Sequence, residues 1–149
     1  MRAVVTRVKE ASVTIDGVVT GKIEKGFLIL LGITQEDTPA LCRKLAEKVL
    51  GLRIFTDENG KMNKSLSDVG GSVLVVSQFT LYGDCSHGRR PSFLAAAGPD
   101  QAIPLYEQFL ADCARLGFPP QHGTFGAHMQ VASVNDGPVT MIVDTKDLK

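Results

Sequence analysis

An unbroken run of apolar residues near the start of the chain most constrains the fold. Residues 27–33 read Phe-Leu-Ile-Leu-Leu-Gly-Ile and directly follow Gly26. The run is too short for an independent helix, shows no alternation and is bounded by glycines, which together predict a buried strand. Residues 73–76 form a second apolar run of this kind. We therefore expect both segments to lie in the middle of a sheet.

Alternating patterns predict further strands on either side of these runs. Residues 1–24 alternate apolar and polar side chains around Asp16-Gly17, a dipeptide typical of tight turns, so they predict a hairpin or short meander. Apolar positions from Met129 to Val143 indicate strands that a turn at 135–138 interrupts. A short strand is expected at 53–55, before a turn and a polar segment that reaches Gly71.

Two segments carry the spacing of amphipathic helices. Thr38-Pro39 is typical of a helix start, apolar residues recur from Leu41 to Leu52, and we expect this helix to end near Gly51. The second helix is indicated from Ile103 to Leu116, before glycine and proline. Many short strands with two main helices predict an α+β fold, in which a mostly antiparallel or mixed, barrel-like sheet forms one domain over residues 1–149.

Composition narrows the function classes. The 149 residues include 16 basic and 16 acidic side chains, so no global field attracts a polyanion, and nucleic-acid binding must be local. The absence of Trp and an aromatic content of 6% argue against a broad base-stacking platform. The three cysteines, of which Cys42 and Cys113 are expected in the core, lack metal-ligand or disulfide spacing. We expect a cytoplasmic protein without membrane spans.

Ser77-Gln78-Phe79-Thr80 is the first candidate site, because it follows the buried strand at 73–76. Hydroxyls, an amide and backbone N–H groups converge there, although a plain polar strand end would look the same. No nearby His-Asp pair predicts a base for a Ser or Thr nucleophile. Backbone N–H groups, by contrast, can stabilise an oxyanion without any titrating side chain.

A basic loop and a Gly-Pro segment supply two further candidates. Arg89 and Arg90 stand beside the first motif and suit the phosphates of a nucleic-acid end, unless the loop is simply solvated. Asn135-Asp136-Gly137-Pro138 reads as a turn, but a cis Gly-Pro bond there would aim carbonyl groups in one direction. The three histidines show no metal-ligand spacing, and we expect no metal or cofactor.

Taken together, these segments resemble the D-aminoacyl-tRNA deacylases of the bacterial type over nearly the whole chain. The resemblance rests on Met1-Arg2-Ala3-Val4-Val5, on the blocks at 77–84 and 88–93, and on Asn135-Asp136-Gly137-Pro138-Val139-Thr140. It implies a hydrolase that cuts the ester joining a D-amino acid to tRNA and thereby edits for chirality. It also implies a homodimer in which a cis Gly137-Pro138 reaches the partner's pocket.

The resemblance further implies residue roles. The segment from Ser77 to Thr80 would hold the aminoacylated terminal adenosine, and the carbonyls at Gly137-Pro138 would exclude L side chains while admitting glycine. Two mechanisms stay open: Thr80 attacks the ester, or the substrate's 2′-hydroxyl helps activate water while backbone N–H groups near Phe79 and Thr80 hold the oxyanion. We favour the second, with Thr80 in a positioning role.

Two alternatives from other classes remain. A non-catalytic module that binds RNA ends would use Arg89 and Arg90 on phosphates and the strand end at 77–80 on a base. A small-molecule esterase fits less well, because the chain lacks both a catalytic triad and the G-x-S-x-G motif. Release of D-amino acid from tRNA with turnover separates the three.

Overall fold

A computed structural model describes every residue from Met1 to Lys149. The chain forms a mixed α+β structure whose elements follow in the order β1 (Arg2–Ile15), β2 (Val18–Ile23), β3 (Gly26–Gly32), α1 (Pro39–Leu50), β4 (Phe55–Thr56), β5 (Met62–Lys64), α2 (Leu66–Val69), β6 (Ser72–Ser77), η1 (Phe79–Tyr82), α3 (Pro99–Arg115), β7 (Gln121–His122), β8 (Gln130–Asp144) and η2 (Thr145–Asp147). The fold class predicted from the sequence is confirmed.

The long strand β1 organises the main sheet. Its first half pairs with β3 and its second half with β2, both antiparallel and on the same edge. The opposite edge pairs with β8 over almost the full length of both strands. Beyond β3 the sheet continues with β6 and β7 in parallel. The two apolar runs are β3 and β6, neighbours in the centre of the sheet, as predicted.

The sheet curls until it nearly closes into a barrel. Strand β7 comes so close to β2 that a Cβ added at Gly21 would lie 3.0 Å from the carbonyl oxygen of His122. This close approach explains why a glycine stands at that position. The curled sheet encloses a small apolar cluster made of Val8, Ala11, Val13, Ile23, Leu28, Leu74 and Val76. The barrel-like character that we predicted is therefore present.

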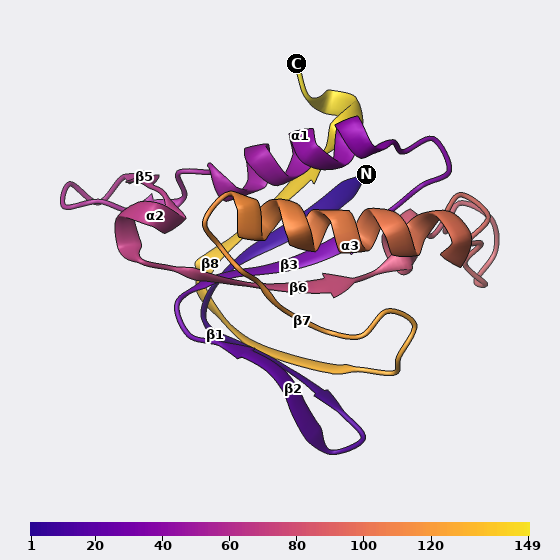
Figure 1. The fold of residues 1–149 in the computed structure, drawn as a ribbon, viewed down its shortest axis with the longest axis horizontal. Coiled ribbons are helices and arrows are strands. Elements are labelled where there is room, and N and C mark those ends of the chain that lie inside the picture. Colours follow the sequence, from indigo (N-terminus) through magenta and orange to yellow (C-terminus); the bar gives the residue numbers. More distant parts are fainter.

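The larger core lies between the sheet and two helices. Figure 1 shows α1 and α3 side by side along one face of the sheet, with the β1–β2 hairpin extending away from them. Helix α1 begins where expected, because the Thr38 hydroxyl accepts a hydrogen bond from Leu41 N–H and Pro39 occupies the first turn. The thiols of Cys42 and Cys113 are fully buried there, and burial raises the pKa of each to about 12.

The prediction that a turn at 135–138 separates two strands is wrong. Strand β8 runs through it without reversing, and both of its halves pair with β1. The register shifts there, with Val8 opposite Asn135 but Thr6 opposite Thr140, so the intervening residues form an outward bulge. The turn-rich composition is real, but β1 is long enough to template β8 on both sides of it.

Two smaller differences concern local structure. The polar segment before Gly71 contains the short pair β4–β5 and helix α2, which Ser65 and Asp68 close in a capping box. Helix α3 starts at Pro99, four residues before the apolar pattern begins, and continues through Pro104. A proline this near the helix start removes only one hydrogen bond. No helix combines the length and apolar character needed to cross a membrane.

Candidate active site

A cavity of about 240 Å³ opens where β6 ends. Ser77, Gln78 and Phe79 form one of its walls. The opposite wall comes from the irregular segment before β8 and from the start of that strand, and consists of Phe125, Gly126, Ala127, His128, Met129 and Val131. Three of the predicted site residues are therefore gathered at one concave surface.

The backbone of the first wall is shaped by the end of the parallel ladder. Gln78 N–H donates to the Leu31 carbonyl at 2.8 Å, and the chain then tightens into η1, where Leu81 N–H donates to the Gln78 carbonyl at 3.2 Å. The N–H groups of Phe79 and Thr80 open this 3₁₀ turn and so have no partner within it. The turn thus presents two backbone donors beside the cavity.

The Thr80 hydroxyl is held by its neighbour. Its Oγ accepts a hydrogen bond from the side-chain amide of Gln78, and the residue is exposed. No histidine or carboxylate hydrogen-bonds to it, although His128 lines the neighbouring cavity. A hydroxyl nucleophile requires a base within hydrogen-bonding reach. The geometry therefore suits Thr80 to positioning better than to attack.

An apolar shelf adjoins the backbone donors. The Phe79 ring is 56% exposed and meets the edge of Phe93, with ring centroids 5.2 Å apart. A smaller apolar hollow behind the turn shares Ser77, Gln78, Phe79 and Phe125 with the main cavity and is completed by Leu31, Ile33, Ala97 and Ala102. The site combines few polar groups with much apolar surface, as ligand sites commonly do.

Arg89 and Arg90 lie outside the cavity, exposed in the loop that follows η1. The ends of this loop are joined, because Asp84 and Ser92 exchange two backbone hydrogen bonds of 2.7 and 2.9 Å. The Ser86 hydroxyl and N–H hold the pKa of the Asp84 carboxyl below its usual value. The two guanidinium groups are thus available to a large ligand that extends beyond the cavity.

The Gly-Pro bulge is braced from within its own chain. The Gly137-Pro138 peptide bond is cis, as the resemblance implied. The Asp136 carbonyl accepts from Nε of the buried Arg7 at 2.9 Å, and Arg7 Nη1 donates to the Ile54 carbonyl at 2.8 Å. On the other side, the Asn135 side chain accepts from Val139 N–H at 3.1 Å. The bulge is well supported, yet Gly137 and Pro138 are exposed.

Within one chain the bulge and the cavity are far apart. Val131 lines the cavity, and Gly137 lies further along the same strand. Since a strand advances about 3.3 Å per residue, the stretch from Val131 to Gly137 spans roughly 20 Å. The structure therefore brings Ser77, Gln78, Phe79 and Thr80 together but leaves Asn135, Gly137 and Pro138 outside that group.

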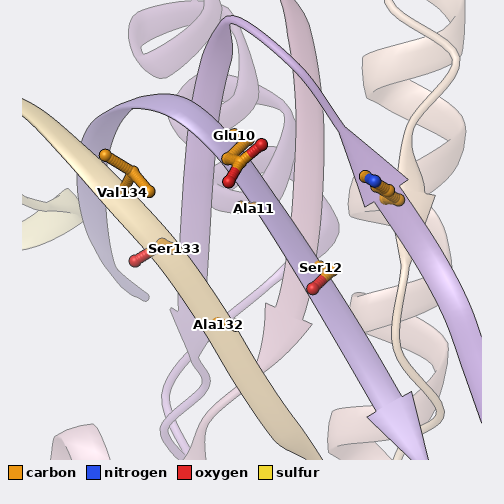
Figure 2. Close-up of a pocket in the computed structure, with 7 residues that line it drawn as sticks. Glu10, Ala11, Ser12, Ala132, Ser133 and Val134 are labelled. Atoms are coloured by element: carbon orange, nitrogen blue, oxygen red, sulfur yellow. The ribbon is translucent and has the colours of Figure 1, made fainter.

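Another hollow, of about 180 Å³, lies over β1, β2 and the first part of β8. Figure 2 shows Glu10, Ala11 and Ser12 on β1 facing Ala132, Ser133 and Val134 on β8. Lys22 on β2 completes the lining. No residue predicted for the site lines this hollow. Its opposite charges, Glu10 and Lys22, give it no preference for an anionic ligand.

Sequence reasoning missed the second wall of the cavity. Met129 was expected in a strand, and neither Phe125 nor His128 was given a role in the site. The only available signal was the pair Gly123 and Gly126, which lie in a stretch between a helix and a strand. Nowhere in the chain do three or more His, Cys, Asp or Glu side chains gather in a way that would hold a metal ion.

Known proteins match this chain along nearly its whole length. The family model described as D-Tyr-tRNA(Tyr) deacylase matches residues 4–144. The D-aminoacyl-tRNA deacylase of Thermus aquaticus is 59% identical over 99% of this chain and 97% of its own. The protein of that name from Thermosipho africanus is 56% identical over 98% of each chain.

Two solved structures share the fold. One, described as a c-Myc DNA unwinding element binding protein, has a TM-score of 0.91 and 42% identity, and the match covers 97% of this chain and 98% of that one. The other, described as a probable eukaryotic D-amino acid tRNA deacylase, has a TM-score of 0.81 at 17% identity, over 95% and 97% of the two chains, and supports the fold alone.

These matches extend across the strand end, the turn η1 and the Gly-Pro bulge. They make the protein a hydrolase of the class that acts on carboxylic ester bonds. More narrowly, the chain belongs to the D-aminoacyl-tRNA deacylase family.

Proposed function

We propose that this protein hydrolyses the ester bond of D-aminoacyl-tRNA and spares the L form, so that it edits the chirality of charged tRNA in the cytoplasm. The observation that carries the proposal is the pair of backbone donors at Phe79 and Thr80 beside a cavity without a nucleophile–base pair. Such a site suits an ester whose carbonyl oxygen gains negative charge during the reaction. Arg89 and Arg90 contact phosphates of the tRNA end.

The chemistry follows the assisted route. The 2′-hydroxyl of the terminal ribose helps to activate a water molecule, which attacks the ester carbonyl. The N–H groups of Phe79 and Thr80 receive the developing oxyanion, and the leaving ribose oxygen takes up the proton. Ser77, Gln78 and Thr80 orient the aminoacylated adenosine. The alternative in which Thr80 attacks requires a base that no contact of its hydroxyl supplies.

The gate comes from a second copy of the chain. Gly137 lies roughly 20 Å from its own cavity by strand length, so it reaches a cavity only in a partner. Most of β8 is exposed in the single chain, and its apolar side chains Val131, Val134 and Ile142 are 39%, 47% and 72% exposed. An exposed apolar strand of this length fits a homodimer interface.

The proposed gate works by exclusion. Carbonyl groups at Gly137-Pro138 of the partner occupy the space that an L side chain requires, with Asn135 and Arg7 holding the bulge in place. A D side chain points elsewhere, and glycine has no side chain to exclude. The enzyme is therefore tolerant of side-chain identity and also accepts glycyl-tRNA.

The direct test compares release of labelled amino acid from D-Tyr-tRNA, L-Tyr-tRNA and Gly-tRNA with a chelator present. We expect multiple turnover on the D and glycyl substrates and none on the L substrate. Release of tyrosine from both D-Tyr-tRNA and L-Tyr-tRNA would contradict the proposed exclusion of L side chains. Binding of all three tRNAs without any release would favour the RNA-end binding module.

Mixing two defective variants tests whether two chains build each site. Phe79→Pro removes a backbone donor from the pocket, and Gly137→Ala crowds the gate. Random exchange of subunits between them gives about a quarter of the wild-type activity, because half of the dimers are mixed and each mixed dimer has one intact site. Activity that stays at the level of the separate variants, despite proven subunit exchange, would contradict a shared site.

A further inference from the structure

Arg2 lies where the start of β1, the end of β8 and the turn η1 meet. It stands at the start of β1, where it pairs with Gly32 on β3 and with Asp144 on β8. Its side chain reaches Leu81 near the end of η1 and lines a separate hollow of about 450 Å³, not the cavity beside Phe79. The role of this residue does not follow from the sequence, where it is one polar member of an alternating strand.

Three contacts fix the Arg2 guanidinium. Its Nε donates to Asp144 Oδ2 at 2.9 Å, its Nη1 donates to the Leu81 carbonyl at 2.7 Å, and it lies 4.7 Å from the centroid of the Tyr82 ring. The Asp144 side chain is only 7% exposed. Burial opposes ionisation of Asp144, but hydrogen bonds from Lys146 N–H and from Arg2 outweigh it and hold its pKa below the usual value.

The turn η1 packs directly against Gly32 on β3. A Cβ added at Gly32 would lie 3.0 Å from Leu81 Cβ and 3.2 Å from the Tyr82 ring, so η1 rests directly on the backbone of β3. The turn is thus attached at its start, through Gln78 N–H and the Leu31 carbonyl, and at its end, through Arg2. Phe79 and Thr80 lie between these two attachments.

We propose that Arg2 is a positioning residue that sets the direction of the Phe79 and Thr80 N–H groups by holding the end of η1. This inference rests on the proposed function, because those N–H groups are its oxyanion donors. Arginine suits the task, since its planar guanidinium directs two N–H groups at separate acceptors in a fixed geometry. A lysine ammonium at the same position keeps the charge but loses that geometry.

A purely structural role for Arg2 makes different predictions. An ion pair that only stabilises the fold affects the melting temperature and leaves the activity per folded molecule unchanged. A tRNA contact by Arg2 would raise KM. A positioning role lowers kcat with KM nearly constant, because the oxyanion forms only as the reaction proceeds.

Arg2→Lys and Asp144→Asn test the inference on D-Tyr-tRNA, with Arg53→Lys as the matched control. Arg53 also donates to a backbone carbonyl, that of Asn63 at 2.7 Å, but it stands beside β5 and away from η1. We expect kcat of Arg2→Lys to fall about tenfold or more, as small misplacements of reacting groups do, with KM within about twofold. The double variant with Asp144→Asn is no slower, because both changes act through one contact.

Chemical rescue protects the test against a folding defect. In Arg2→Ala, guanidinium ion at millimolar concentration occupies the vacated site between Asp144 and the Leu81 carbonyl and restores part of kcat, whereas it does nothing for Arg53→Ala. An unchanged kcat in Arg2→Lys, or a loss that only follows the melting temperature, overturns the inference while the proposed function stands. A wild-type protein that releases no D-tyrosine overturns the proposed function first.

Discussion

The two candidate segments of this protein are both firmly held, but one faces a cavity of its own chain and the other faces solvent. The turn at 77–82 is seated on β3, tied at both ends to other strands and backed by Phe93. The bulge at Gly137-Pro138 is braced just as firmly by Arg7 and Asn135 but projects outward, with nothing of its own chain in front of it. One segment forms the wall of a cavity, and the other is a rigid projection.

This difference indicates which part of the function belongs to one chain. Backbone donors, cavity and basic loop all belong to one chain, so the proposed ester chemistry draws its groups from a single subunit. The projection has to meet a cavity to exclude anything, and the cavity beside Phe79 lies out of its reach within one chain. Variants of the turn therefore test the groups that one chain supplies, whereas variants of the bulge test what a partner chain supplies.

The largest effect is expected from the turn itself. Phe79→Pro removes one N–H donor at the first position of a helical turn, where proline is tolerated, and Phe79→Ala removes the same ring but keeps the donor. We expect the proline variant to lose about 10²- to 10³-fold in kcat relative to the alanine variant, as for other oxyanion donors. Equal single-turnover rates for the two would exclude this donor.

The next effect is expected from the bulge. A Cβ at Gly137, where φ is +138°, would lie 2.7 Å from Val139 Cγ2, 2.8 Å from Val139 N and 3.0 Å from Arg7 Nη2, so Gly137→Ala displaces the bulge. The displaced bulge then obstructs the partner's cavity for D-Tyr-tRNA as well, and a misplacement of about 1 Å costs on the order of a hundredfold in kcat/KM for that substrate.

Gly17→Ala is the matched control for that variant. Gly17 also has a positive φ, +78°, but its Cβ would meet no atom within 4 Å. We expect Gly17→Ala to lose some stability and no activity. If Gly137→Ala keeps its activity and still rejects L-Tyr-tRNA, the proposal that the bulge is the gate is contradicted.

A smaller effect is expected from the basic loop. Replacing Arg89 and Arg90 together by alanine raises KM about tenfold and flattens the salt dependence of binding, because two phosphate contacts are lost. Arg43→Ala removes an exposed arginine from α1 and serves as the control. An unchanged slope of log KM against log salt concentration would show that the loop does not contact the tRNA backbone.

The smallest effect is expected at Thr80. Because the proposed role of its hydroxyl is only to orient the substrate, we expect Thr80→Ala to slow turnover a few-fold, by about the worth of one hydrogen bond. Rapid quenching of the wild type followed by mass spectrometry checks the alternative. A trapped acyl group on Thr80 would reverse our preference and make the hydroxyl the nucleophile.

The fold was predictable to the extent that local chemistry decides it. Thr38-Pro39 marks the start of α1 because capping is a property of a few adjacent residues, and the apolar runs identify β3 and β6 for a similar reason. Closure of the sheet depends on Gly21 meeting His122, a contact across a hundred residues that no local pattern records. The bulge in β8 was misread because its turn-like residues compete with pairing to β1.

The site was predictable only on one side. The segment 77–80 stands out as a polar strand end, and the Gly-Pro segment stands out because its bond can be cis, although its role as a gate comes from the resemblance. Phe125 and Met129 escaped notice because apolar residues in a cavity wall look like core residues in sequence. Arg2 and Arg7 escaped because alternation places a side chain on a face of the sheet without naming the carbonyl group that it meets.

The pairing of β1 with β8 also determines when the protein becomes competent. Arg2 pairs with Asp144, so the sheet joins segments from the two ends of the described chain. Contacts of such separation make folding slow, and synthesis proceeds from the amino end. Until β8 emerges, one edge of β1 is unpaired, and both the gate and the wall at Met129 are missing. The proposed site is therefore complete only after β8 has been added, and a stalled nascent chain exposes an edge that invites aggregation.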